Sequence, residues 1–271
     1  AEASRNIISV GGQPLAMVDH CQFGDPNNSE VFWTFSEAVH GMADYCKALN
    51  LPCVGGKVSF YNEDTGTNTA IKPSPIVSVI GLIDKLSHIR TMELKEPGDI
   101  IIELGITKPE MGGSEYYEYI HNFTGGLVPK VNFITESKMQ TLTLELIKKG
   151  LVNSVNDCSK GGLAIALVEM SILGEKGINI DLNNVISECH RIDDVLFSES
   201  HSRMIISTNR NHVNKILDLA RNYDVPCSII GTVKNKDISI NMNKKEIISL
   251  TSSDISKVWS DVIPKCMGEV N

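Results

Sequence analysis

The chain has 271 residues, of which 42% are hydrophobic and 21% are charged, a balance that is ordinary for a globular protein. Its 33 acidic and 25 basic residues give a net charge of −8, which argues against a general binder of nucleic acid or of anionic membranes. No apolar run approaches the roughly 18 residues that a membrane span needs.

The cysteines argue against a metal-binding framework. Seven of them are spread over the chain, and no C-x-x-C pair occurs, so neither a zinc site nor a thioredoxin-like motif is expected. An odd number of dispersed cysteines is typical of reduced thiols. We therefore expect a cytoplasmic protein, and the length predicts one or two domains.

The first stretch predicts a helix followed by a strand that ends in an acid. Residues 1–8 begin within a helix and lack an initiator Met and an N-cap, so we expect the chain to be a fragment of a longer polypeptide. Leu15–Val18 reads as a short buried strand that runs into Asp19 and a glycine-punctuated loop. Such a position is a usual place for a carboxylate that faces a ligand.

A long helix is expected next, because apolar residues recur at alternating steps of three and four. These residues are Phe32, Phe35, Val39, Met42, Cys46 and Leu49. Asn27, Asn28 or Ser29 can cap the start of the helix, and Asn50 can end it. We expect the apolar stripe to pack in the core rather than to hold a cofactor.

The stretch GGKVSFYNE, which begins at Gly55, carries the groups that a phosphate or nucleotide would need. Paired glycines allow a positive φ and a close approach of the backbone to a ligand. Lys57 adds a cation and Ser59 a hydroxyl group. The spacing is not that of a P-loop, and a tight turn between two strands is the alternative. The preceding helix returns the chain, so Asp19 and Gly56 are expected to end neighbouring strands and to face one ligand.

The rest of the chain predicts a second, α/β domain, because strands and helices alternate in it. Ser74–Ile83 reads as the last strand of the first domain, and the charged residues 84–97 join the two domains, which we place at 1–90 and 91–271. The expected strands of the second domain are 100–104, 152–155, 204–207 and 228–233, and the expected helices are 136–149, 163–173 and 212–223.

Two polar motifs mark the second domain. In the first, Asp157, Ser159, Gly161 and Gly162 lie between a strand and a helix. A helix N-terminus binds anions through its free amides and its dipole. Asp157 could bind a metal that bridges to phosphate, or it could simply cap the helix.

The second motif, FSESHSR, begins at Phe197 and precedes a strand. It carries the carboxylate of Glu199, the hydroxyl of Ser200 and the guanidinium of Arg203, which suits phosphate or carboxylate. The alternative is a loop that is braced by a Glu–Arg pair.

The stretches VDHCQFGDP and GGKVSFYNE resemble the second half of the large subunit of phosphoribosylformylglycinamidine synthase, the PurL family of purine biosynthesis. The stretches PSPIV, GGSEY, DCSKGGL and FSES follow in the order of that family, and the resemblance covers nearly the whole chain. It implies a PurM-like fold of mixed α+β and α/β type: a partial N-terminal-type α+β sheet domain followed by a C-terminal-type α/β domain.

The resemblance also implies roles for individual residues. Asp19 and Gly56 match positions that bind ATP, and Ser59 matches one that binds substrate. Lys57 stands where the commoner pattern has an Asn that contacts magnesium; a charged lysine has no lone pair for a metal, so it is expected to contact a phosphate. The later copy of the fold implies an auxiliary nucleotide or phosphate site. Its residues would be Asp157, Ser159, Gly161, Gly162, Glu199 and Ser200, with Asp157 as a possible metal ligand.

The activity that the resemblance implies is the ATP- and Mg²⁺-dependent conversion of formylglycinamide ribonucleotide to its amidine. The family's catalytic His lies in the earlier half, so no catalytic residue is expected in this chain. The implied partners are the N-terminal half of the same protein, a PurQ-type glutaminase and a small PurS-type subunit. The chain alone is expected to be inactive and to form a homodimer through its first domain.

Two alternatives differ in class. In one, the chain is a structural half that holds an auxiliary nucleotide without turnover. In the other, it is a different enzyme of the same fold, such as aminoimidazole ribonucleotide synthetase or selenophosphate synthetase. The second of these usually presents a reactive Cys near a glycine-rich N-terminus, and the chain shows none.

Overall fold

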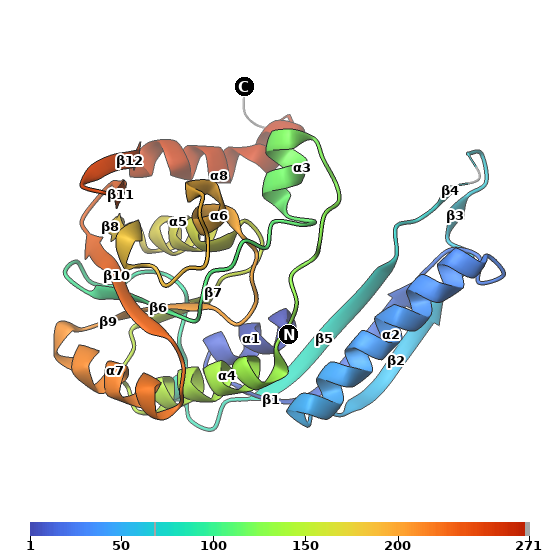
Figure 1. The fold of residues 1–271 in the computed structure, drawn as a ribbon, viewed down its shortest axis with the longest axis horizontal. Coiled ribbons are helices and arrows are strands. Elements are labelled where there is room, and N and C mark those ends of the chain that lie inside the picture. Colours follow the sequence, from blue (N-terminus) through green and yellow to red (C-terminus); the bar gives the residue numbers. More distant parts are fainter. Residues whose placement is uncertain (68, 269–271) are drawn as a thin grey trace.

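A computed structural model describes residues 1–67 and 69–268 of the chain. They form two parts, one around a three-stranded sheet and one around a seven-stranded sheet, and the small sheet extends away from the body of the larger part (Figure 1). Within the described residues, no helix is both long enough and apolar enough to cross a membrane.

The first part is a small sheet with one long helix. Strand β1 lies at the centre of this sheet, parallel to β2 and antiparallel to β5, so β2 is an edge strand. The elements are α1 (Glu2–Ser9), β1 (Gln13–Gln22), α2 (Ser29–Leu49), β2 (Cys53–Ser59), β3 (Glu63–Asp64), β4 (Thr69–Ala70) and β5 (Ser74–Leu82).

Helix α2 begins and ends where the sequence predicts. The side chain of Asn28 accepts a hydrogen bond from the amide of Glu30, and Asn50 ends the helix in the left-handed conformation. The apolar stripe packs only in part. Phe35 makes edge-to-face contacts with Phe23 and Phe60, whereas Phe32 is 54% exposed, so the prediction that the whole stripe is core is wrong.

The second part is a seven-stranded mixed sheet between two layers of helices. Its strand order is β12-β11-β8-β10-β6-β9-β7, and the 3-10 helices of the chain are η1 (Leu86–His88), η2 (Leu182–Asn184) and η3 (Arg210–His212). The strands are β6 (Ile100–Leu104), β7 (Ser154–Asp157), β8 (Gly177–Asp181), β9 (Met204–Thr208), β10 (Cys227–Lys234), β11 (Ile238–Met242) and β12 (Lys245–Leu250). The helices are α3 (Glu115–His121), α4 (Phe133–Lys148), α5 (Gly162–Gly174), α6 (Ile192–Phe197), α7 (Val213–Asn222) and α8 (Ser252–Cys266).

The two faces of this sheet are both apolar, which explains the two helical layers. Ile100, Ile102 and Leu104 of β6 pack with residues of α4 and α7. The alternate residue Ile101 packs with α5 on the opposite face, as the period of two along a strand requires. All five residues of β6 are buried.

The predicted elements of the second part are confirmed, with shifted ends. Strand β7 begins two residues later than expected, at Ser154, and α4 begins at Phe133, where the side chain of Asn132 caps it. The sequence did not predict β8, β11, β12, α3, α6 and α8. The strands β11 and β12 carry polar residues on their exposed face and gain their stability from pairing within the sheet, which a local pattern does not reveal.

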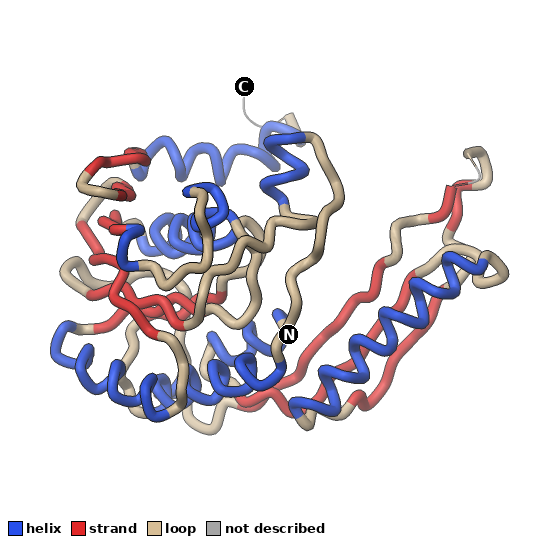
Figure 2. The backbone as a smooth tube through the Cα atoms, in the orientation of Figure 1, coloured by secondary structure: helices blue, strands red, loops and turns tan. Residues whose placement is uncertain are grey.

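Helix α1 joins the two parts. It contacts β1 and β5 of the small sheet and also α4 and β7 of the large part. The loop between α3 and α4 runs down the side of the large part to the start of α4, next to α1 (Figure 2). The position of α1 therefore decides how the small sheet is attached.

A buried carboxyl group lies in an interior strand of the large sheet. Glu103 of β6 is 1% exposed. Its Oε1 accepts a hydrogen bond from Thr107 Oγ1 at 3.2 Å and lies 3.8 Å from Arg203 Nη1, while Oε2 has no partner in the described residues. Burial raises the pKa of Glu103 to about 7, since removal from water penalises the charged form.

We predict that Glu103 makes the stability of the fold fall with rising pH. Its carboxyl pKa rises from 4.5 to about 7 on folding, so the unfolded chain loses this proton first. Stability is therefore lost as the pH rises through this window, by about 3 kcal/mol.

The measurement is chemical denaturation at pH 4.5 and pH 8 of the wild type and Glu103→Gln. The variant has no carboxyl group to titrate at this position. Between pH 4.5 and pH 8, its free energy of unfolding should therefore rise relative to that of the wild type by the amount given above. Parallel pH profiles for the two proteins would contradict the prediction.

Candidate functional site

Asp19 and Gly56 lie side by side on neighbouring parallel strands, as the sequence predicts. They are register partners in the β1–β2 ladder. The prediction that they end their strands is wrong, because β1 continues to Gln22 and β2 to Ser59. The predicted strand was too short because polar residues follow Val18, and on a half-exposed sheet such residues still form strand.

Position 56 needs a glycine because the side chain of Asp19 occupies the space of a Cβ atom, and not because of the backbone conformation. A Cβ atom at this position would lie 2.2 Å from Asp19 Oδ1. Neither Gly55 nor Gly56 is among the residues with a positive φ, so that part of the prediction is wrong. The missing side chain lets the carboxylate of Asp19 lie over β2, toward the edge of the sheet.

Two thiols hold the carboxylate of Asp19. Cys21 Sγ donates to Oδ2 at 3.4 Å, and Cys53 Sγ donates to Oδ1 at 3.5 Å. Burial raises the pKa of Cys21 to about 11, which keeps this thiol protonated as a donor. Asp19 shares its face with Met17, which packs against Tyr45 of α2, so its carboxylate lies on the helix side of the sheet.

Lys57 and Ser59 belong to the opposite face. Their register partners are His20 and Gln22, which alternate with Asp19 along β1. The structure therefore brings Asp19 and Gly56 together but directs Lys57 to the other side of the edge strand. The hydroxyl of Ser59 lies in a turn at the end of β2, where Asn62 Nδ2 donates to Ser59 Oγ at 3.2 Å and to the carbonyl of Phe23 at 3.0 Å.

Asp157 is not free for a ligand in this structure. It ends β7, is 6% exposed and accepts a hydrogen bond from Arg5 Nε at 3.4 Å. It is not the helix cap either, because that position is taken by Gly161. Ser159 is half-buried.

The glycines of this motif are needed for space. Gly161 and Gly162 have φ of 73° and 65°, which favours glycine. A Cβ at Gly162 would lie 2.4 Å from the carbonyl oxygen of Ser198. The loop of residues 197–203 therefore packs directly on the start of α5.

Glu199 and Ser200 brace that loop. Glu199 Oε1 accepts hydrogen bonds from the amides of Gly161 and Glu115, both at 3.0 Å, and so ties the starts of α5 and α3 together. Ser200 Oγ accepts from the amide of Lys108 at 3.0 Å. The alternative interpretation of this motif was a loop braced by a Glu–Arg pair. The loop is braced, but the carboxylate near Arg203 is that of Glu103 and not that of Glu199.

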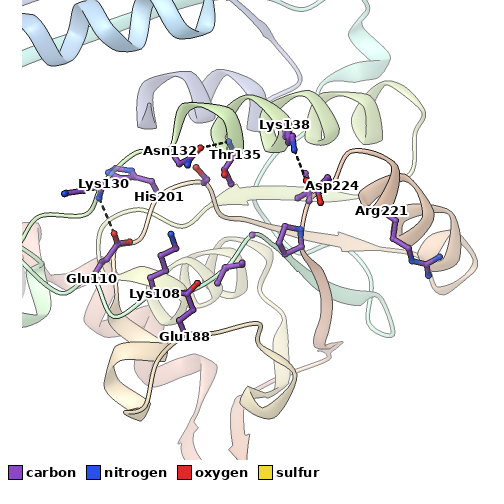
Figure 3. Close-up of a pocket in the computed structure, with 15 residues that line it drawn as sticks. Lys108, Glu110, Lys130, Asn132, Thr135, Lys138, Glu188, His201, Arg221 and Asp224 are labelled. Carbon is purple, nitrogen blue, oxygen red and sulfur yellow. Dashed lines mark hydrogen bonds and ion pairs between the residues drawn. The ribbon is translucent and has the colours of Figure 1, made fainter.

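A cavity of about 570 Å³ opens beside this loop. His201 and Ser202 are the motif residues that line it, and Figure 3 shows Lys108 and Glu188 across the cavity from Asn132 and Thr135, at the start of α4. The sequence did not single out this cavity, because its lining comes from separate segments. Its residues are Gly105, Ile106, Lys108, Glu110, Lys130, Asn132, Thr135, Lys138, Glu188, His201, Ser202, Arg221, Asp224, Val225 and Pro226.

The charges around the cavity are partly paired. Lys138 Nζ lies 2.8 Å from Asp224 Oδ2, and Glu110 Oε1 accepts from the amide of Lys130 at 3.2 Å. Burial is the largest cause that lowers the pKa of His201, and the charge of Arg5 adds to it. The imidazole of His201 is thus favoured in its neutral form.

Neither Asp157, the possible metal ligand, nor Lys57, which stands at the family's magnesium position, fits Mg²⁺ in this structure. Within residues 1–67 and 69–268, no group of three His, Cys, Asp or Glu side chains is arranged to hold a metal ion. Magnesium takes oxygen ligands, Lys57 offers none, and the carboxylate of Asp157 is paired with Arg5.

Comparison with known families and proteins gives a consistent match. The profile of the AIR synthase related protein, N-terminal domain, matches residues 1–83, and that of its C-terminal domain matches residues 96–242. The subunit PurL of phosphoribosylformylglycinamidine synthase from Caldanaerobacter subterraneus is 40% identical over 96% of this chain, and that from Methanocaldococcus jannaschii is 39% identical over all of it. The chain spans only 34% and 37% of their lengths.

A solved structure shows the same fold. T. maritima PurL complexed with FGAR has a TM-score of 0.75 at 18% identity, over 93% of this chain and 41% of that chain. The predicted mixed fold with two PurM-like domains and the resemblance to PurL are confirmed. With profiles for both of its domains matched in order, the chain belongs to the AIR synthase related protein family.

Proposed function

We propose that the chain is the later half of a phosphoribosylformylglycinamidine synthase and supplies ATP and substrate contacts to an ATP-dependent C–N ligase. The relatives of about 40% identity carry that name, and structures of T. maritima PurL are complexes with ATP and with FGAR. The observation that carries the proposal is the register of Asp19 with Gly56, because it joins two motifs that lie more than thirty residues apart.

The edge of β2 is the place where we put ATP. An edge strand presents backbone groups that no neighbouring strand uses. Asp19 reaches this edge over Gly56 from one face, and Lys57 reaches it from the other. Phosphates along the edge would contact the ammonium of Lys57 and the amides of β2, and formylglycinamide ribonucleotide would contact Ser59 at the strand's end.

The auxiliary nucleotide site stays a second proposal, in reduced form. Glu199 and Ser200 are engaged in bracing bonds and Asp157 in an ion pair. The side chain of Ser159 remains for a phosphate at the start of α5. The amides of Gly161 and Gly162 already donate to Glu199 Oε1 and to the carbonyl of Ser159, so a phosphate bound at this helix start would replace these two bonds.

The remaining partners and the domain division are proposals as well. We propose that the complete enzyme needs an N-terminal half, a PurQ-type glutaminase and a small PurS-type subunit, since the T. maritima structures include a PurLQS assembly. Magnesium would enter with ATP, held by phosphates and by residues outside this chain. We place the domain boundary near residue 90, between α1–β5 and β6.

We predict that Gly56→Ala raises the KM for ATP about tenfold, equivalent to about 1.4 kcal/mol. The new methyl group would occupy the place of Asp19 Oδ1, at 2.2 Å, and displace the carboxylate. The measurement is steady-state kinetics of the complete gene product with varied ATP.

The matched control is Gly55→Ala, whose new Cβ would have Val18 Cγ1 as its nearest neighbour at 3.8 Å. Its KM for ATP should stay within about twofold of the wild-type value. Equal effects of the two substitutions would remove Asp19 from the nucleotide site.

Ser59→Ala should raise the KM for formylglycinamide ribonucleotide several-fold and leave that for ATP nearly unchanged. The reason is that the hydroxyl group is assigned to the substrate. Because Ser59 Oγ also bonds Asn62, Asn62→Ala serves as the comparison for a disturbed turn. The assignment fails if the Ser59 variant weakens both ligands in the same ratio as the Asn62 variant does.

The bare face of the small sheet supports the proposed homodimer. Helix α2 covers one face. The other face carries Ile76, Ile80 and Leu82, which are 51%, 54% and 55% exposed. Such an apolar patch on a sheet is typical of an interface, and a two-fold contact would bury it in both copies.

In sedimentation at micromolar concentration, the 271-residue chain should therefore be a dimer. Ile80→Lys should shift it to monomer, since it places a charge in the contact. Leu86→Lys is the control, because Leu86 is 85% exposed in η1, outside this sheet. A wild-type chain that sediments as a monomer would refute the dimer.

A further inference from the structure

The guanidinium of Arg5 is fully buried between the two parts of the molecule. Arg5 lies in α1 and is 1% exposed. Its Nη1 lies 3.2 Å from both carboxylate oxygens of Glu136, and its Nε lies 3.4 Å from Asp157 Oδ2. Glu136 is 0% and Asp157 is 6% exposed, so one cation serves two carboxylates out of water.

The other contacts of Glu136 complete a closed network. Ser202 Oγ donates to Glu136 Oε2 at 2.5 Å, and Gln140 Nε2 donates to Glu136 Oε1 at 2.8 Å. Gln140 Nε2 also lies 3.0 Å from the hydroxyl oxygen of Tyr45. The network therefore joins α1, α2, α4, β7 and the loop before β9.

The place of Arg5 is the place where a metal would be expected. Asp157 ends β7 directly before the glycine-rich start of α5, and it was the one carboxylate of the second domain that the sequence offered as a metal ligand. A divalent cation beside Asp157 would need this carboxylate and further oxygen ligands. The nearest oxygen atoms that could serve as metal ligands are those of the Glu136 carboxylate, and they already accept hydrogen bonds from the guanidinium of Arg5.

We infer that Arg5 is the resident cation of the Asp157 site and replaces a divalent metal there. The guanidinium neutralises Asp157 and Glu136 through fixed hydrogen bonds, whereas a metal would be exchangeable. Asp157 is thereby part of a permanent link between α1 and the second domain and not a ligand of a metal. The inference rests on the proposed function only in taking Asp157 as the metal position of the auxiliary site.

The test is removal of the resident cation in the complete gene product without nucleotide. We expect Arg5→Ala to gain one Mn²⁺ site per chain relative to the wild type, measured as loss of the free-Mn²⁺ signal in electron paramagnetic resonance. The gained site should bind at least tenfold more tightly than any Mn²⁺ site that the wild type has at this position. MnCl₂ should also raise the melting temperature of Arg5→Ala by more than it raises that of the wild type.

Two further variants identify the site. Arg5→Ala combined with Asp157→Asn should lose the gained Mn²⁺ site, and Arg5→Lys, which keeps a cation, should not gain it. A folded Arg5→Ala variant that gains no Mn²⁺ would overturn the inference. So would a gained site that survives Asp157→Asn.

A comparison with Arg5 intact keeps the inference testable if Arg5→Ala does not fold. The wild type and Asp157→Asn should then bind the same amount of Mn²⁺, because the carboxylate is not a metal ligand. Loss of a Mn²⁺ site in Asp157→Asn would overturn the inference. None of these measurements depends on turnover, so a failure of the proposed activity would be seen separately, in the kinetics.

Discussion

The attachment of the small sheet depends on the buried guanidinium group of Arg5. A charge that leaves water must be paired and hydrogen-bonded, or it costs several kcal/mol. Arg5 meets this condition only while Glu136 of α4 and Asp157 of β7 are both in place. Since Arg5 lies on α1, the helix that contacts both sheets, the pairing requirement also fixes where the small sheet attaches.

The same requirement explains why the polar motifs of the second domain look like a binding site in the sequence and act as bracing in the structure. Acids, hydroxyls and glycines beside a helix start suit a phosphate, and they equally suit a loop that must be held in a water-poor place. Glu199 shows the second use, because one oxygen of its carboxylate accepts from the amides that begin two helices. The residue types of such a motif therefore allow either phosphate binding or bracing of a loop, and the burial of the motif decides between the two.

Local features of the fold could be predicted because their causes are local. The caps of α2 and the buried strand β6 follow from residues within a few positions of each other. The partners of Arg5 could not be predicted, since they lie 131 and 152 residues away. The placement of Asp19 and Lys57 on opposite faces of the sheet could have been predicted. Strand alternation requires it once β1 extends to Gln22, but the polar residues after Val18 led to a shorter predicted strand.

The two faces of the edge strand set a condition on any nucleotide site in the first domain. A ligand held by Asp19 alone would lie under α2, and one held by Lys57 alone would lie on the bare face. Contact with both requires the ligand to cross the edge of β2, where this chain offers only one side of a pocket. The ATP site that we propose would have to exclude water for phosphate transfer, so its other side would come from a second surface. The bare apolar face beside Lys57 is continuous with that edge, so a surface that covers the face would also close the proposed site.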